Sequence, residues 1–227
     1  MRSGSIEEMI LEGRAVVKRL AQDLNIAEAS WAHFEAINGE TEDSRRDLRE
    51  AASWLRVSFA GLHSALLRDT LLALSRPLDK RPESSLLCQV AKLLSERELV
   101  KHLIEEVANA EWRQSDIALI SASVPLQWNN TKPRHPALYE WRESLEPLRN
   151  KMLAHSDPAA SINVQGMNFV RDGLKLIAEL VRAAERTFNG AAVSSSFSGL
   201  MRHADLFWDY AQVGFIEAHL RDQRAKR

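Results

Sequence analysis

The chain has 227 residues, and its 30 Lys and Arg balance 31 Asp and Glu to a formal net charge of −1. Only 9 Gly and 7 Pro are present, while 45% of the residues are hydrophobic and 27% are charged. This composition excludes collagen-like, low-complexity and wholly disordered chains, and it disfavours a β-sandwich with many tight turns. The balanced charge disfavours a protein that coats nucleic acid through a generally basic surface.

The cellular setting is predicted from three features. Cys88 is the only cysteine, so no intrachain disulfide is possible. The longest apolar runs have four residues, whereas a membrane span needs about twenty. The N-terminal segment turns acidic at Glu7, where a signal peptide would turn apolar. We therefore expect a soluble, cytoplasmic protein that has no contact with a membrane.

Helical patterns follow one another along the chain. A capping box at Ser5–Glu8 opens the first helix, and a second helical segment ends at Asn38-Gly39. The longest pattern runs from about 42 to 76 and ends before Pro77. A polar surface loop is predicted at 77–84 and an irregular stretch at 121–136. The remaining helices are predicted near 85–94, 96–112, 137–155, 163–188 and 200–222.

These patterns predict an all-α fold, a helical bundle of six to eight helices without a convincing strand. We expect one domain over residues 1–227, because no linker or low-complexity tract divides the chain.

The helix predicted at 137–155 carries the most informative pattern. Its apolar residues recur at three- and four-residue spacing and form a seam that packs against other helices: Leu138, Trp141, Leu145, Leu148 and Met152. His155 continues the spacing, and Arg149 lies about 120° away and about 9 Å along the axis of a regular helix. Spacing alone leaves open an explanation without catalysis, in which His155 ends the helix and Arg149 lies on its solvent-exposed side.

Two segments resemble a known family. The run Leu148-Arg-Asn-Lys-Met-Leu-Ala-His-Ser-Asp157 resembles the R-(polar)-x-x-x-x-H signature of the HEPN superfamily, in the form found in AbiU abortive-infection proteins. The run Arg68-Asp-Thr-Leu-Leu-Ala-Leu-Ser-Arg-Pro-Leu-Asp79 resembles the early helix of that group, which ends in a similar Ser-Arg-x-x-Asp turn. The resemblance covers roughly 45–185, so helices at 5–38 and 200–222 would pack on this core.

The resemblance implies a four-helix core that forms a homodimer with the motif helices facing each other, and often a metal-independent endoribonuclease. Arg149, Asn150 and His155 are then the candidate catalytic residues. Histidine is suited to proton transfer near neutral pH, and the guanidinium fork matches phosphate oxygens. Attack by the 2′-OH would make RNA, not DNA, the substrate.

Four more residues are candidates for supporting this site from beside it: Arg68, Asp69, Lys151 and Asp157. Some toxins of the superfamily carry a Tyr two places after the motif His, where a partner nucleotidyltransferase modifies it. This chain has Asp157 there, so the resemblance implies no such partner.

The predicted function is therefore an RNase, with a toxin role in phage defence as one form of it; an antitoxin or another defence partner is left open. The alternatives are a non-catalytic helical dimer that binds RNA, nucleotide or protein, and a purely structural interaction protein.

Other candidate sites are weaker. Glu98, His102 and Glu106 lie four residues apart, but no companion Glu-x-x-His helix is evident, so we expect neither a metal nor a cofactor. Trp128 in the irregular stretch is a weak candidate for base stacking. Cys88 is predicted to be a small buried hydrophobic residue.

The neutral net charge is unevenly distributed. Residues 132–155 hold five basic and three acidic residues, whereas 96–111 hold five Glu. A small basic groove is thus compatible with the composition.

Overall fold

The computed structural model describes residues 5–38, 53–79, 81, 83–107, 110–128, 136–154, 164–192 and 197–225. Over these ranges the fold is all-α, as predicted, and holds eight α-helices and no strand. The elements are α1 (Ile6–Asn38), α2 (Ser53–Ser75), the short 3₁₀-helix η1 (Arg76–Leu78), α3 (Leu86–Leu93), α4 (Arg97–Glu105), α5 (Glu111–Ser123), α6 (Pro136–Ala154), α7 (Val164–Asn189) and α8 (Phe197–Ala225).

Helix α1 begins at the predicted capping box. The Glu8 amide donates to Ser5 Oγ at 3.2 Å, and the Ser5 amide donates to Glu8 Oε2 at 2.9 Å. The prediction of two separate helical segments before Asn38 is wrong, because α1 is one helix of 33 residues. Leu24 and Ala27 are buried in the stretch between the two predicted segments, and they continue the three- and four-residue spacing of the core face.

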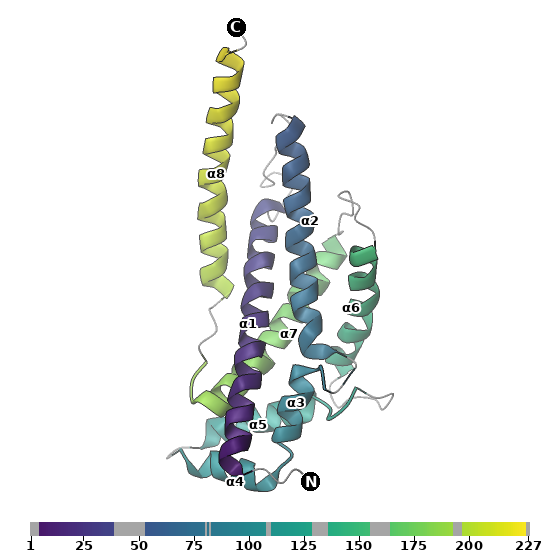
Figure 1. The fold of residues 1–227 in the computed structure, drawn as a ribbon, viewed down its shortest axis with the longest axis vertical. Coiled ribbons are helices and arrows are strands. Elements are labelled where there is room, and N and C mark those ends of the chain that lie inside the picture. Colours follow the sequence, from purple (N-terminus) through teal and green to yellow (C-terminus); the bar gives the residue numbers. More distant parts are fainter. Residues whose placement is uncertain are drawn as a thin grey trace.

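Helix α1 runs through the middle of the bundle. It packs against α2, α3, α4, α7 and α8, and Figure 1 shows α2 beside it and α7 crossing behind it. Its largest buried side chains, Trp31 and Phe34, stack with their ring centroids 4.9 Å apart. One continuous apolar core thus connects α1 with helices α2 to α7.

Buried carboxylates of α1 are paired with arginines of α7. Glu28 accepts a hydrogen bond from Arg182 at 2.8 Å, and Glu35 accepts one from Arg171 Nε at 2.8 Å. Both glutamates are at most 9% exposed. Such pairs set the register of two helices, because a buried charge without its partner is costly.

Helix α2 ends at Ser75, one residue short of the predicted end, and residues 42–52 of the predicted helix lie outside the described part of the chain. Thr70 and Ala73 of the predicted buried face are buried, but Leu62 is 43% exposed. The loop predicted at 77–84 is not wholly a polar surface segment, since Pro77 and Leu78 are buried in η1. Pro77 stops α2, and its ring and Leu78 then enter the core.

The prediction of one helix at 96–112 is wrong, because α4 ends at Glu105 and a new helix, α5, begins at Glu111. Helix α5 occupies the start of the stretch predicted as irregular. Its Ile117 and Ile120 are buried at helical spacing, and it packs across α7.

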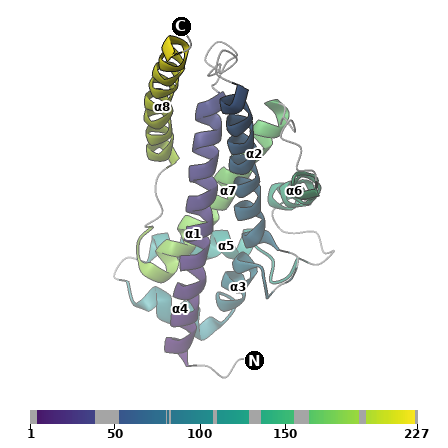
Figure 2. The same cartoon turned by 45° about the horizontal axis from the view of Figure 1, so that its top comes forward.

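Helices α6, α7 and α8 agree with the predicted ranges to within three residues at each end. Helix α8 lies beside the C-terminal half of α1 and extends beyond it (Figures 1 and 2). A second small apolar cluster joins these two helices and includes Ala36, Ala204 and Trp208. No helix among the described residues is long and apolar enough to cross a membrane.

Candidate functional site

The candidate motif begins on α6, which lies at the edge of the molecule and packs on α2 and α7 (Figure 2). Three residues of the predicted seam, Leu138, Trp141 and Leu145, are at most 5% exposed, and Leu148 packs against the same core. The side chain of Met152 lies outside the described residues. The described part of the seam thus faces the core of its own chain.

Trp141 fixes α6 on α7. Its indole N–H donates to the Phe169 carbonyl at 2.8 Å, and the two rings stack with centroids 5.5 Å apart. This pair satisfies the one polar group of a buried aromatic ring, so the helix that carries the motif has a defined position.

Arg142 fixes α6 on η1. Its Nε donates to the Leu78 carbonyl at 3.0 Å, its Nη1 lies 2.6 Å from Glu143 Oε1, and the residue is only 6% exposed. The guanidinium also lies over the ring of Trp128, 5.0 Å from its centroid. A buried arginine held at three points acts here as a structural cross-link.

Ser85 connects η1 to the segment that precedes α6. Its Oγ donates to the Pro77 carbonyl at 2.8 Å and accepts from the Trp128 indole N–H at 3.1 Å. Trp128 is 8% exposed. The base-stacking role suggested for Trp128 is therefore wrong, because Arg142 and the core cover the ring.

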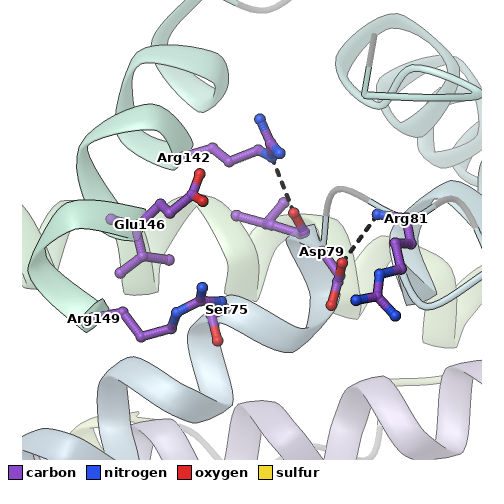
Figure 3. A pocket seen from close by; sticks show the side chains of 8 residues that line it. Ser75, Asp79, Arg81, Arg142, Glu146 and Arg149 are labelled. Carbon is purple, nitrogen blue, oxygen red and sulfur yellow. Dashed lines mark hydrogen bonds between the residues drawn. The ribbon is translucent and has the colours of Figure 1, made fainter. Parts of the chain in front are cut away.

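These contacts frame a cavity of about 260 Å³ between α6 and the junction of α2 with η1 (Figure 3). Its lining combines three arginines, two carboxylates and one hydroxyl above a small apolar floor: Ser75, Leu78, Asp79, Arg81, Arg142, Leu145, Glu146 and Arg149.

Arg149 joins the motif to this cavity. The residue is half-buried, and Figure 3 shows its side chain extending from α6 toward the end of α2 that carries Ser75. Its Nε and Nη2 donate to Asn150 Oδ1 at 3.3 and 3.0 Å. Asn150 thus orients the guanidinium.

The supporting residues predicted on α2 do not line this cavity. Arg68 and Asp69 pair with each other at 3.7 Å, their side chains are 52% and 51% exposed, and neither lines the cavity. His155 and Asp157 and the side chain of Lys151 lie outside the described residues.

The sequence prediction missed Ser75, Asp79, Arg81, Arg142 and Glu146 as lining residues. A signal for two of them was present, because Ser75 and Asp79 are the first and last residues of the Ser-Arg-x-x-Asp turn. Asp79 is held in place by the residues that follow this turn, since its Oδ1 accepts from the Arg81 amide at 3.0 Å.

The other candidates are structural in character. His102 Nε2 lies 3.4 Å from Glu106 Oε1, and the described residues hold no group of three or more His, Cys, Asp or Glu that could bind a metal. Burial raises the pKa of the Cys88 thiol, as expected for an inert core cysteine.

Comparisons of the chain with protein-family models, with curated proteins and with solved structures found no match.

Proposed function

We propose that the protein is a HEPN-like, metal-independent endoribonuclease that acts in the cytoplasm. The observation that supports this proposal is the meeting of the two HEPN-like segments in one cavity. Arg149 comes from the first segment, and Ser75 and Asp79 come from the turn of the second, about seventy residues earlier in the chain. If the resemblance of the two segments were due to chance, nothing in it would lead us to expect both segments in one pocket.

The proposed chemistry uses groups of this chain alone. Cleavage of RNA requires a base that removes the 2′-OH proton and an acid that protonates the leaving 5′-oxygen. His155 takes these proton transfers, because the unperturbed pKa of histidine is about 6.5. Arg149, oriented by Asn150, stabilises the charge that develops on the phosphate oxygens in the transition state.

A homodimer would complete this site. The outward side of α6 exposes residues at helical spacing, among them Glu140, Glu143, Pro147 and Asn150. Two such faces packed about a two-fold axis would bring two copies of the motif together. One histidine would then act as base while the other acts as acid.

Cleavage of RNA by the full-length chain in EDTA tests the proposal. We expect cleavage that persists in EDTA and stops when the nucleotide before the cut carries 2′-deoxyribose. His155→Ala and Arg149→Gln should each reduce the rate by at least about a hundredfold. Arg97→Gln, which changes an exposed arginine on helix α4, outside the cavity, is the matched control and should cleave at the wild-type rate.

Other results would point elsewhere. Cleavage that survives His155→Ala would refute the assignment of this residue, and EDTA-sensitive cleavage would refute the metal-independent mechanism. RNA binding without cleavage would favour the non-catalytic module. For the toxin role, we expect that expression of the protein slows the growth of cells and that Arg149→Gln relieves the effect.

A further inference from the structure

We propose that the cavity beside Arg149 is a ribonucleotide subsite, in which Arg149 and Arg81 hold a phosphate and Asp79 recognises the ribose 2′-OH of the nucleotide next to the cut. This inference rests on the proposed function for its substrate, RNA, and adds the residues that would select ribose. Its first support is the mixture of charges in the cavity.

The cations of the cavity come from two different elements. Arg149 extends from α6, and Arg81 follows η1 on the opposite side of the opening (Figure 3). Arg142 is engaged with the Leu78 carbonyl and Glu143, so it supports the wall. Two guanidinium groups that face one space suit a phosphate. Asn150 accepts from Nε and Nη2 of Arg149, which leaves the Nη1–Nη2 edge of that guanidinium for the ligand, and Arg81 offers a second planar set of N–H donors.

The acceptors of the cavity require a ligand that also donates hydrogen bonds. A phosphodiester has only acceptors, so it leaves Asp79 without a partner from the ligand. The 2′-OH of ribose can donate, and an acidic side chain that accepts from this group recognises ribose in dinucleotide-binding α/β folds. Ser75 adds a second acceptor, because its hydroxyl hydrogen is used on the Leu72 carbonyl at 2.8 Å and its lone pairs remain.

The acceptor side of the cavity is rigidly placed. Asp79 Oδ1 accepts from the Arg81 amide at 3.0 Å, and the carbonyl groups just before it are held by Ser85 and by Arg142. A carboxylate that is fixed in this way needs little reorganisation when the ligand arrives.

The size of the cavity suits the ribose and phosphate of one nucleotide. Its volume of about 260 Å³ is slightly below the roughly 300 Å³ at which pockets for drug-sized ligands begin. Arg149 forms one wall, so the nucleotide held there is adjacent to the phosphate on which Arg149 acts. The subsite would bind single-stranded RNA next to the cut.

The test measures binding in the absence of cleavage. A short fluorescein-labelled single-stranded RNA and the DNA of the same sequence are titrated against the full-length His155→Ala protein, and fluorescence anisotropy gives both Kd values. We expect RNA to bind more tightly than DNA. Adding Asp79→Asn should weaken RNA binding by about tenfold, whereas DNA binding should stay the same or tighten slightly, because a negative charge beside the phosphate is removed. The asparagine oxygen can still accept from the Arg81 amide, so the turn is retained.

Two further variants separate the roles. Arg81→Gln should weaken the binding of RNA and DNA equally, because both carry the phosphate. Asp172→Asn makes the same chemical change at an exposed carboxylate on α7, outside the cavity, and should alter neither Kd. Circular dichroism of each variant verifies that it is folded.

Three results would overturn the inference: no RNA binding at all, equal losses for RNA and DNA on Asp79→Asn, or a loss that depends on the base and not on the sugar. Failure of the two proposals is distinguishable. Ribose-selective binding through Asp79 in a protein that does not cleave RNA would support the subsite and refute the nuclease. Cleavage that requires His155 but not Asp79 would support the nuclease and refute the subsite.

Discussion

The indole ring of Trp141 on α6 lies directly on the backbone of Gly173 on α7. A Cβ atom at Gly173 would overlap the ring at Cε2, Cζ2 and Nε1. The helix that carries the candidate motif can therefore approach α7 this closely only because residue 173 has no side chain. Trp141 also donates its N–H to the Phe169 carbonyl one turn earlier on α7, so the ring cannot move aside without losing that bond.

Gly173→Ala should displace Trp141 and loosen α6. We expect the free energy of unfolding to fall by about 1–3 kcal/mol, as for other overpacked cores, and the Tm to fall by several degrees. Because α6 also carries Arg149, activity or RNA binding measured well below the Tm should fall as well. Thermal denaturation and urea titration measure the first effect.

Gly61→Ala is the matched control. Gly61 is also in a helix, but it is exposed and nothing lies within 4 Å of the place that a Cβ would take. This variant should gain roughly 0.5–1 kcal/mol from the better helix propensity of alanine. Equal stability of the two variants would contradict the role assigned to the contact between Gly173 and Trp141.

The all-α fold could be predicted because helical spacing and stop signals are local properties of the sequence. The end of α2 was predicted to within one residue from Pro77, and the start of α1 was predicted from Ser5 and Glu8. The continuity of α1 was missed because the polar residues between its two apolar groups, such as Glu28, looked like an interruption. The structure explains them, since Arg182 of α7 meets Glu28 inside the fold, and sequence spacing does not reveal such a distant partner.

The candidate site could be predicted only in part for the same reason. The sequence indicated Arg149 and Asn150 because they are neighbours in one motif. Asp79 and Arg81 reach the cavity through the packing of η1 on α6, which depends on Arg142 and the Leu78 carbonyl. No periodic pattern encodes that contact. Arg68 is near Asp79 in the sequence and lies on nearly the same side of α2 as Ser75, but seven residues place it about 10 Å farther along the helix, so it does not line the cavity.

Asp116→Asn should destabilise the contact between α5 and α7. Asp116 accepts from Arg186 Nε at 2.8 Å and from Arg186 Nη2 at 2.6 Å, and its side chain is 9% exposed. The amide keeps one acceptor and places an NH₂ group against the guanidinium. We expect a loss of about 1.5–3 kcal/mol in urea denaturation.

Asp69→Asn gives the comparison for this variant. It removes the charge from an equally simple Arg–Asp pair whose two side chains are about half exposed. Exposed pairs contribute little, so its free energy of unfolding should stay within about 0.5 kcal/mol of the wild type. If both variants lose the same stability, the pair between Arg186 and Asp116 has no special part in the fold.

Glu28 should make the protein less stable as the pH rises. Burial raises the pKa of Glu28, and the nearby Glu185 adds to this, while the charge of Arg182 opposes it. Glu28 Oε2 is buried without a hydrogen-bond partner. The folded protein therefore binds more protons at this group than the unfolded chain does. The stability that Glu28 contributes is complete below the ordinary value of 4.5 and is lost as the pH rises through the raised pKa.

Glu28→Gln isolates this effect, because glutamine resembles the protonated acid and does not titrate. The stability of the variant relative to the wild type should increase above pH 4.5, by at most about 1.4 kcal/mol per pH unit, and then level off. Urea denaturation at a series of pH values measures it. A constant difference between the two proteins across this range would show that Glu28 is ionised in both states.

Acid should break the contact between His33 and Trp208 and thereby release α8 from α1. The Trp208 indole N–H donates to His33 Nδ1 at 3.1 Å, so this nitrogen must be unprotonated. Burial lowers the pKa of His33 from its ordinary value of 6.5. The unfolded chain therefore binds the proton first, and the stabilisation from this contact is complete above about pH 6.5 and is lost as the pH falls through the lowered pKa.

Limited proteolysis of α8 tests this prediction with a protease that is active from about pH 8 to about pH 5. Cleavage within residues 197–225 should become faster in acid in the wild type. Trp208→Phe lacks the N–H donor, so its α8 should be cleaved faster at the higher pH and change less on acidification. His102→Ala removes a histidine from the distant helix α4 and should behave as the wild type does. Acid-independent cleavage of wild-type α8 would show that protonation of His33 does not control its docking.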